Sequence, residues 1–361
     1  MGSMQGKTYL AGDLGGTKTL LAIFSDLNGV LKKEHIHRYV SAEWTSLESM
    51  LKDFLRRLPD TCSPPETSCL AVAGPVKNHS AELTNLGWTI SEASLKGASG
   101  LNQIEIVNDF AVLIHGLSHF SDSQQITLQS GEGPTNPSST QADRGPVAIL
   151  GAGTGLGMAR GVPSATGWIA LPSEGGHREF APRCHDEWAL VQWLKRELSL
   201  ERISIERIVS GTGLGHVMHW KLQQTEEASH PLQKHAKAWR TLKPDQPGYQ
   251  DLPALTSQYA QAGDRLAIEA MELWLSAYGA AAGDLALQEL CTGGLWIGGG
   301  TAEKNQAGLQ SNHFLDAMQR KGRFQPFMQG LTVRAVIDPE AGLFSAACRA
   351  RELAESSGTL A

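Results

Sequence analysis

Residues 8–24 read TYLAGDLGGTKTLLAIF, and this stretch decides the fold that we expect. Thr8 to Ala11 has the pattern of a short strand, Gly12 to Gly16 forms a glycine-rich turn, and Leu20 to Phe24 is a second β-rich run. Val30 to Val40 has the pattern of a third strand. The stretch therefore predicts a β-hairpin, with glycines at its tip, at the start of the fold.

The same kind of unit returns in the middle of the chain. Val147 to Leu150 has a strand pattern, Gly151 to Gly157 is rich in glycine, and Met158 to Gly161 can begin a return strand. Between and after the two units, strand patterns alternate with helical patterns, among them Asp186 to Leu198 and Asp264 to Leu290. Two strand–glycine-turn–strand units predict two related α/β halves.

The first glycine turn has the composition of a phosphate site. GDLGGTKT, residues 12–19, nearly matches a P-loop, but Thr17 stands where the second required glycine should be. A P-loop would also open a helix, whereas the following run looks extended. The pattern favours a hairpin whose backbone amides approach a phosphate, with Asp13 holding Mg²⁺ directly or through water. A tight hairpin without a ligand remains the alternative.

The second turn, GAGTGLG at 151–157, has a glycine at every second position. It fails the dinucleotide fingerprint, because Leu156 occupies the last required glycine position and no helix opens there. On an extended chain this spacing leaves one face without side chains, so a ligand or another part of the protein must lie against that face. A second phosphate contact and close packing of the chain are the two explanations. A third cluster, residues 293–300, suits the approach of an adenine or ribose, or again packing alone.

Two groups of polar residues complete the candidate site. Asn108 and Asp109 follow an apolar strand pattern, where Asp109 is either a helix N-cap or a carboxylate that accepts the proton of an attacking hydroxyl. Glu174 and His177 flank a Gly-Gly pair, and their acceptor and donor atoms suit sugar hydroxyls, although an exposed polar loop is the alternative. Glu206, before the strand-like Ile208-Val209, is either a further hydroxyl acceptor or a charged surface residue.

Composition excludes several classes of partner. The formal net charge is −6 and the pI is about 6.1. This balance gives no indication of a basic surface that would bind nucleic acid or an anionic membrane. The five cysteines have no metal-ligand spacing, and no apolar run approaches the roughly 20 residues that span a bilayer. We therefore expect a cytoplasmic protein without nucleic-acid or membrane partners.

Taken in order, the runs GDLGGT, VNDF, GAGTGLG, SEGGH and ERIVSGTGL resemble the bacterial glucokinase family, within the hexokinase/actin-like ATPase superfamily. The likeness extends from about Leu10 to Phe344. It implies an α/β, two-domain actin-like ATPase (ribonuclease H-like) fold with a cleft between a small and a large domain. The implied domains are residues 4–115 plus 338–361 (small) and 116–337 (large). The implied activity is phosphorylation of D-glucose to glucose 6-phosphate with ATP and Mg²⁺, in a homodimer. A broader-specificity hexose or N-acetylhexosamine kinase, or a non-kinase actin-like nucleotide-binding ATPase, remains open.

The resemblance also implies residue roles. Asn108 and Asp109 match the family's sugar-binding pair, with Asp109 as the base, and Glu174, His177 and Glu206 match its remaining glucose contacts. Asn85 and Trp88 match a TNxxW-like stretch beside the sugar loop. The residues that the resemblance assigns to the nucleotide are Gly12, Asp13, Leu14, Gly15, Gly16, Thr17, Gly151, Gly153, Thr154, Gly155 and Gly299, with Asp13 also the metal ligand.

The chain departs from the family pattern in two respects. Ser173 stands where glycine is usual before the Glu, which bears on the geometry of that turn. The loops at 130–145 and 223–263 look longer than in compact members, which bears on sugar selectivity and on contacts between subunits.

Overall fold

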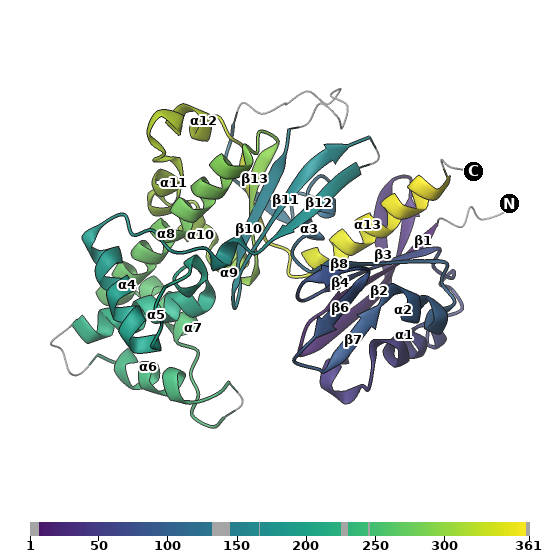
Figure 1. Ribbon diagram of the computed structural model, residues 1–361, viewed down its shortest axis with the longest axis horizontal. Helices are drawn as coiled ribbons and strands as arrows, with labels where there is room; N and C mark the ends of the chain where they lie inside the picture. The colour runs from purple at the N-terminus through teal and green to yellow at the C-terminus, as the bar shows by residue number, and fades with distance from the viewer. Residues whose placement is uncertain (1–6, 132–144, 166, 225–229, 245, 359–361) are drawn as a thin grey trace.

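The computed structural model describes residues 7–131, 145–165, 167–224, 230–244 and 246–358 (Figure 1). Its first half contains a five-stranded sheet in the order β3-β2-β1-β4-β8. The three strands from β3 to β1 are antiparallel, and β1, β4 and β8 are parallel. The bounds are β1 (Thr8–Leu14), β2 (Lys18–Leu27), β3 (Val30–Val40), β4 (Thr67–Val72) and β8 (Gln103–Asn108).

The second sheet repeats this order. It runs β12-β11-β10-β13-β14-β9, with β12, β11 and β10 antiparallel and β10, β13 and β14 parallel. The additional strand β9 pairs antiparallel with β14 at the edge. The bounds are β9 (Gln125–Gln129), β10 (Val147–Ala152), β11 (Leu156–Ser164), β12 (Gly167–Ser173), β13 (Gly294–Gly298) and β14 (Val333–Val336). The prediction of two related α/β halves is confirmed.

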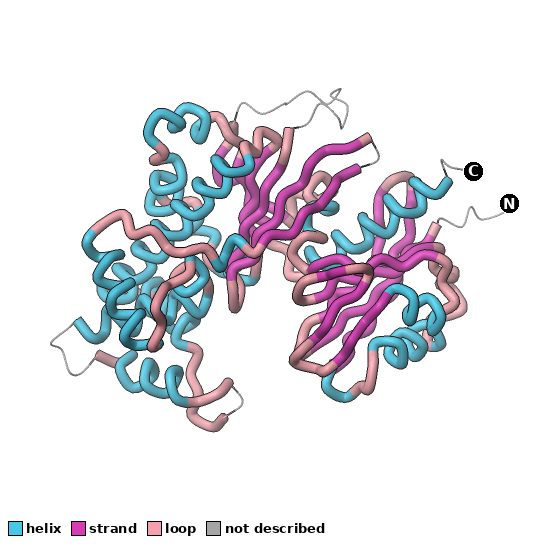
Figure 2. Tube along the Cα trace, in the orientation of Figure 1, coloured by secondary structure: helices cyan, strands magenta, loops and turns pink. Residues whose placement is uncertain are grey.

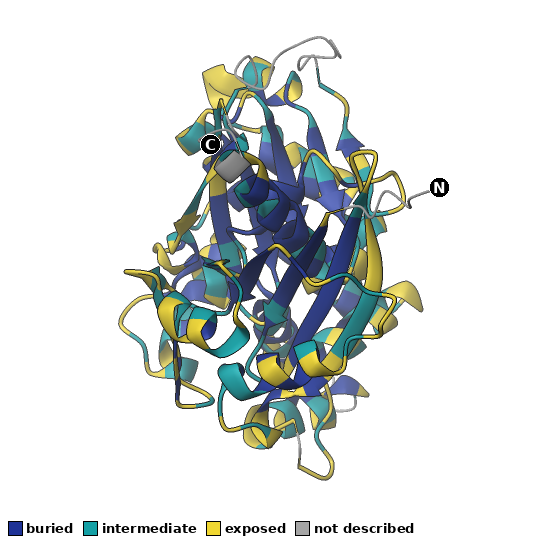
Figure 3. Ribbon diagram, turned by 90° about the vertical axis from the view of Figure 1, so that its right-hand side faces the viewer, coloured by how far each residue is buried: buried dark blue, intermediate teal, exposed yellow. Residues whose placement is uncertain are grey.

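Helices cover both faces of the first sheet. The alternation of β1 places Leu10 in one core with α1 (Leu47–Arg56) and α2 (Glu92–Ser99), while Tyr9 and Ala11 belong to the opposite core. That opposite face is covered by α13 (Ala341–Gly358), the last helix of the chain (Figures 1 and 2). We call this unit the first lobe. Figure 3 views it from outside and shows its inner strands buried, whereas the outer faces of the helices and the edge strand β3 are largely exposed or half-buried.

The second lobe surrounds the second sheet and is largely helical. Its long helix α8 (Arg265–Glu289) packs closely on α11 (Asn312–Gln319), because Gly279 and Gly283 leave no Cβ between the two backbones. The other helices are α4 (His185–Leu198), α5 (Gly211–Gln224), α6 (Leu232–Thr241), α7 (Leu252–Gln261), α9 (Gly300–Lys304), α10 (Gln306–Leu309) and α12 (Gln325–Gln329). The expected helices at 186–198 and 264–290 are confirmed to within a residue or two. The stretch 223–263, which the sequence analysis treated as a loop, contains the two helices α6 and α7.

Short elements connect these parts. The strands β5 (Val76–Lys77), β6 (Ser80–Leu83) and β7 (Trp88–Ser91) form a small third sheet that the sequence patterns did not predict. The helix α3 (Leu113–Gly116) follows β8 closely and packs on α13. Short 3₁₀ helices are η1 (Ser41–Glu43), η3 (Gly175–His177), η4 (Ile205–Arg207) and η5 (Gly322–Phe324).

Three further expectations concern the domain boundaries, the loop at 130–145 and membrane-spanning helices. The domain boundaries at 115 and 338 stay a prediction, although α13 does return to the first sheet. Most of the loop at 130–145 lies outside the described residues. Within the described ranges, no helix is long and apolar enough to cross a membrane.

Candidate active site

The first glycine turn is shorter than the predicted Gly12 to Gly16 and begins later in the chain. Strand β1 continues through Leu14, so the turn comprises Gly15, Gly16 and Thr17. Gly12 and Leu14 are buried strand residues; a Cβ on Gly12 would lie 2.6 Å from Leu70 Cδ2. These two residues therefore pack within the sheet, and their assignment to the nucleotide stays a prediction.

A buried serine shapes the turn. The Ser41 hydroxyl donates to the Gly15 carbonyl at 3.1 Å, and the Ser41 amide donates to the Thr17 carbonyl at 3.1 Å. The Gly15 amide donates to the Lys18 carbonyl at 2.9 Å. Within the described chain, the amides of Gly16 and Thr17 donate to no protein acceptor. The tip of the hairpin thus presents two free amides, as an anion site requires.

Two carboxylates lie near this turn at the ends of parallel strands. Asp13 is at the end of β1, and Asp109 directly follows β8. Burial is the main cause that raises the pKa of Asp109 to about 6, and the negative charge of Asp13 adds to it. Burial also raises the pKa of Asp13, against the opposing effect of Lys18. Asp109 is nevertheless exposed to solvent, so it lies at the carboxyl edge of the sheet and not inside the core.

The capping role at this point belongs to Asn108. Its Oδ1 accepts hydrogen bonds from the amides of Phe110 (3.1 Å) and Ala111 (3.0 Å). Its Nδ2 donates to the Gly74 carbonyl at 3.0 Å and to Asp109 Oδ1 at 3.1 Å. Asn108 thus accepts from the amides that follow β8, and the Asp109 carboxylate is held by Asn108 Nδ2 and by the backbone amides of Asp109 and Phe110.

At two positions of the second glycine run, the structure shows the close packing that was one of the two explanations for its spacing. A Cβ on Gly151 would lie 2.6 Å from Phe110 Cε2, and one on Gly157 would lie 2.5 Å from Phe110 Cδ2. The ring of Phe110 thus covers the bare face at these two positions. Gly151 is also buried between β11 and β13. Close packing explains why no side chain fits at Gly151, whose assignment to the nucleotide stays a prediction, and the packing joins the Asp109 segment to the second lobe.

The tip of this second turn remains open. No atom lies within 4 Å of a Cβ added to Gly153. The tip's carbonyls are occupied: Gly153 O accepts from the Gly211 amide at 2.8 Å, and Thr154 O accepts from Thr212 Oγ1 at 3.0 Å. In the part of the chain that the structure describes, the amides of Thr154 and Gly155 have no acceptor. The second tip therefore resembles the first in presenting free amides.

Glu206 is attached to this second turn. Its Oε2 accepts from the Leu156 amide at 3.0 Å and lies 2.5 Å from the position of a Cβ on Gly155. Glu206 belongs to η4, and Ile208 and Val209 lie between η4 and α5, so the strand expected after it is wrong. The half-buried Glu206 is thus no free surface charge.

His177 ends η3 and Glu174 directly precedes it, and η3 packs against the same turn. The space that a Cβ on Gly176 would need is taken by the Leu156 carbonyl. Glu174 Oε2 and His177 Nε2 are 3.6 Å apart, and the two side chains are 76% and 58% exposed, respectively. The structure therefore brings Glu174, His177 and Glu206 to one turn, through Leu156.

The third glycine cluster adjoins the second turn as well. Gly299 has φ +81°, and a Cβ there would lie 2.5 Å from the Ala152 carbonyl, so only glycine fits. The same carbonyl accepts from Thr301 Oγ1 at 2.8 Å. Gly300 faces open space at the start of α9.

Several residues around the site escaped the sequence patterns. Ser41 shapes the first turn, the buried Tyr278 hydroxyl accepts from the Ala152 amide at 3.0 Å, and Gly342 in the first turn of α13 lies against Asp13, with its Cβ position 3.7 Å from Asp13 Cγ. All three lie far along the chain from their partners, so no local pattern could reveal them. Among the described residues, no group of three or more His, Cys, Asp or Glu side chains could hold a metal ion by itself.

Comparisons with known proteins show which family the chain belongs to. The family model described as Glucokinase matches residues 10–353. A glucokinase from Synechocystis is 38% identical over 358 residues, which cover 96% of this chain and 98% of the relative. The solved glucokinase of an Antarctic psychrotroph has a TM-score of 0.78 at 27% identity, over 96% of this chain and 99% of that one. A ROK family glucokinase from Streptomyces griseus, solved with glucose and AMPPNP, shares the fold alone (TM-score 0.57, 18% identity, 96% and 99% covered).

Proposed function

The chain belongs to the glucokinase family, and from that premise we propose how its residues carry out the reaction. It phosphorylates glucose at the expense of ATP, giving glucose 6-phosphate, on the actin-like fold that its structural neighbours share. Phosphoryl transfer of this kind depends on positioning and on stabilising charge, more than on covalent help from the protein.

Asp109 is the general base. As O6 of glucose attacks the γ-phosphorus of ATP, the O6 proton passes to the Asp109 carboxylate and ADP leaves. The observation that carries this assignment is the exposed carboxylate of Asp109, held by Asn108 and with its pKa raised to about 6. A base with a pKa near the working pH is ionised at neutral pH and still accepts a proton readily.

The sugar is held by both lobes. Asn108 adjoins Asp109 on the first lobe, while Glu174 and His177 offer exposed acceptor and donor atoms on the second. Glu206 contributes from the base of the second turn, where one of its oxygens already accepts from Leu156. Carboxylate and imidazole groups of this kind suit the vicinal hydroxyls of a hexose.

The nucleotide phosphates are held by the two glycine tips. Gly15, Gly16 and Thr17 form the first tip, and Gly153, Thr154 and Gly155 form the second, each with free amides. Gly299 lies beside the second tip, packed against the Ala152 backbone, and the family resemblance assigns it to the nucleoside. Backbone amides that converge on one place bind phosphate without any excess of basic side chains.

Asp13 is the residue that fits a magnesium ion. A carboxylate is the hard oxygen ligand that Mg²⁺ prefers, and usually only one or two protein carboxylates take part beside the phosphates. Here burial raises the pKa of both Asp13 and Asp109, and for Asp109 the negative charge of Asp13 adds to the effect of burial. When bound with ATP, Mg²⁺ neutralises charge on the phosphates.

The setting of the enzyme is also a proposal. The family resemblance supports a cytoplasmic homodimer that binds neither nucleic acid nor membrane. Light scattering on the purified protein tests the dimer, and a mass of one subunit contradicts it.

An ADP-coupled assay over a panel of hexoses tests the function. We expect glucose-dependent ADP release, with kcat lowered by about 10²-fold or more in Asp109→Asn because the base is lost, while glucose binding stays intact. Glu174→Gln should raise KM for glucose with a smaller effect on kcat. Unchanged turnover in Asp109→Asn removes Asp109 from its role, and equal turnover with N-acetylhexosamines favours the broader kinase.

A further inference from the structure

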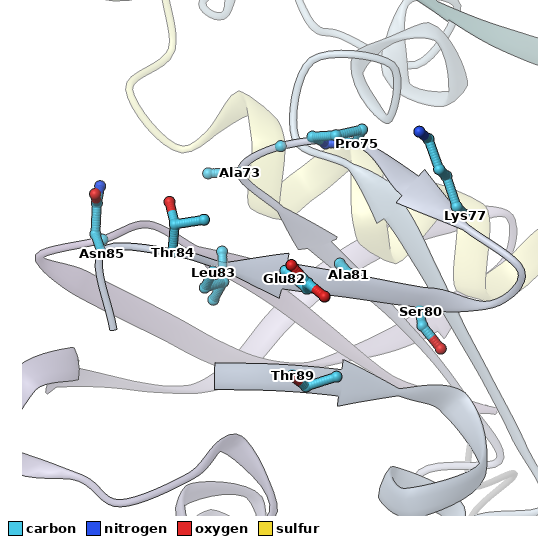
Figure 4. Close-up of a pocket in the computed structure, with 12 residues that line it drawn as sticks. Ala73, Pro75, Lys77, Ser80, Ala81, Glu82, Leu83, Thr84, Asn85 and Thr89 are labelled. Atoms are coloured by element: carbon cyan, nitrogen blue, oxygen red, sulfur yellow. The ribbon is translucent and has the colours of Figure 1, made fainter. Parts of the chain in front are cut away.

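A cavity of about 520 Å³ opens beside the first glycine turn (Figure 4). Its wall includes Gly16 of the turn, Gly74 at the end of β4, and both strands of the β6–β7 hairpin. The polar side chains on this wall are Lys77, Ser80, Glu82, Thr84, Asn85 and Thr89. The cavity is large enough for a small ligand or part of one.

The alternation of β6 explains why this wall is polar. Ala81 and Leu83 are buried in the core of the first lobe, so Glu82 and the residues that follow the strand face outward. Figure 4 shows Thr84 and Asn85 projecting from the same side of the chain after β6. Within the described residues, the side chains of Glu82, Thr84 and Asn85 donate to or accept from no protein group.

Asn85 has a particular place on this wall. A Cβ added to Gly16 would lie 3.2 Å from Asn85 Nδ2 and 3.6 Å from Asn85 Cβ, so the side-chain amide packs on the bare face of Gly16. The same cavity wall includes Gly74, whose carbonyl accepts from Asn108 Nδ2 at 3.0 Å. Asn85 therefore lies against the first turn, on a wall that Gly74 links to the Asn108–Asp109 pair.

We propose that Asn85 contacts the transferred phosphoryl group, its side-chain amide donating to a non-bridging oxygen as the group passes from ATP to glucose. This inference rests on the proposed function, since it takes the first turn as a phosphate site. Three hydrogen-bond donors then lie close together: the amides of Gly16 and Thr17 and the NH₂ group of Asn85. They stabilise the negative charge that the equatorial oxygens of the transferred phosphoryl group carry in the transition state. The residues assigned to the sugar, in contrast, are mostly attached to the second turn.

The first test separates a phosphoryl contact from a sugar contact. Asn85→Ala should lower kcat by about 10- to 100-fold, as loss of one donor to a transition-state oxygen does, while the Kd for glucose stays within about twofold. Asn85→Asp should lower kcat further, because a carboxylate repels the phosphoryl oxygens. Thr89→Ala, from the opposite strand of the cavity wall, and Asn102→Ala, an exposed asparagine of the same lobe, serve as controls and should keep wild-type kcat.

A double-mutant cycle tests the contact between Gly16 and Asn85. In the wild-type background, Gly16→Ala forces the Asn85 amide to shift, because the added Cβ would lie only 3.2 Å from Nδ2. In the Asn85→Ala background that atom is gone. The loss of kcat caused by Gly16→Ala should therefore be at least threefold smaller in Asn85→Ala than in wild type. Equal losses in both backgrounds overturn the contact.

The outcomes distinguish this inference from the proposed function. If the wild-type enzyme releases no ADP in the presence of glucose, the proposed function fails. If the wild type is active but Asn85→Ala keeps kcat within twofold, or raises KM and Kd for glucose at unchanged kcat, only the role of Asn85 fails. Circular dichroism checks folding of each variant, and Asn85→Ser replaces the alanine variant if that one does not fold.

Discussion

Replacing Gly157 by alanine should slow phosphoryl transfer from a position that no substrate touches. The added Cβ would lie 2.5 Å from Phe110 Cδ2 and 2.6 Å from Phe110 Cγ, whereas ordinary contacts begin at 3.4 Å. The ring must therefore withdraw by about 0.9 Å, the difference between 3.4 and 2.5 Å. Phe110 directly follows Asp109 in the chain, so the proposed base moves with it.

The expected loss follows from that displacement. Misplacing a catalytic group by about 1 Å lowers the rate by about 10²-fold, so we expect kcat to fall by about 10- to 100-fold. Overpacking should also lower the free energy of unfolding by about 1–3 kcal/mol. The coupled ADP assay measures kcat and KM, and urea unfolding measures stability.

Two further variants make the argument refutable. Phe110→Leu in the Gly157→Ala background gives the added methyl group room and should recover part of kcat. Gly97→Ala on α2 is the matched control: no atom lies within 4 Å of its Cβ, so activity should not change. A Gly157→Ala enzyme with wild-type kcat, or one that Phe110→Leu does not improve, refutes the reasoning.

The remaining predictions concern charge and the second turn. Because burial raises the pKa of Asp109 to about 6, kcat/KM should fall as pH drops below about 6; a pH–rate profile that is flat to pH 5 contradicts this. A raised pKa means that the folded state binds the proton more tightly than the unfolded state, so the ionised carboxylate destabilises the fold above pH 6. Asp109→Asn should therefore melt higher than wild type at pH 8, with the difference vanishing near pH 4, which thermal unfolding at both pH values checks. Gly153→Ala should raise KM for ATP without loss of stability, because no protein atom opposes its Cβ; an unchanged KM removes Gly153 from the nucleotide site.

The sequence predicted the parts of the fold that depend on local pattern. The hairpin at residues 8–24 and its counterpart at 147–161 have strand periodicity interrupted by glycine, and both are formed. The strands β5 to β7 were missed because they span only two to four residues each, too few for a periodic signal.

The sequence could not show which side chain occupies the space beside a glycine. The glycines at 151 and 157 correctly indicated a bare face, but the ring that covers it comes from Phe110, beyond any local window. Asn108 and Asp109 are both good capping residues, and only the direction of the backbone after β8 gives the cap to Asn108. The roles of the site residues stay proposals.

The return of α13 to the first sheet has a consequence for synthesis on the ribosome. Leu343, Ala346 and Ala350 are fully buried against the face of the sheet that carries Tyr9 and Ala11. That face stays uncovered from the emergence of β8 until Ala341 to Gly358 have been made, on the order of 10 to 50 s at usual elongation rates. The first lobe is therefore the last to be completed. A nascent chain that stalls before α13 exposes an apolar sheet face to chaperones or to other chains.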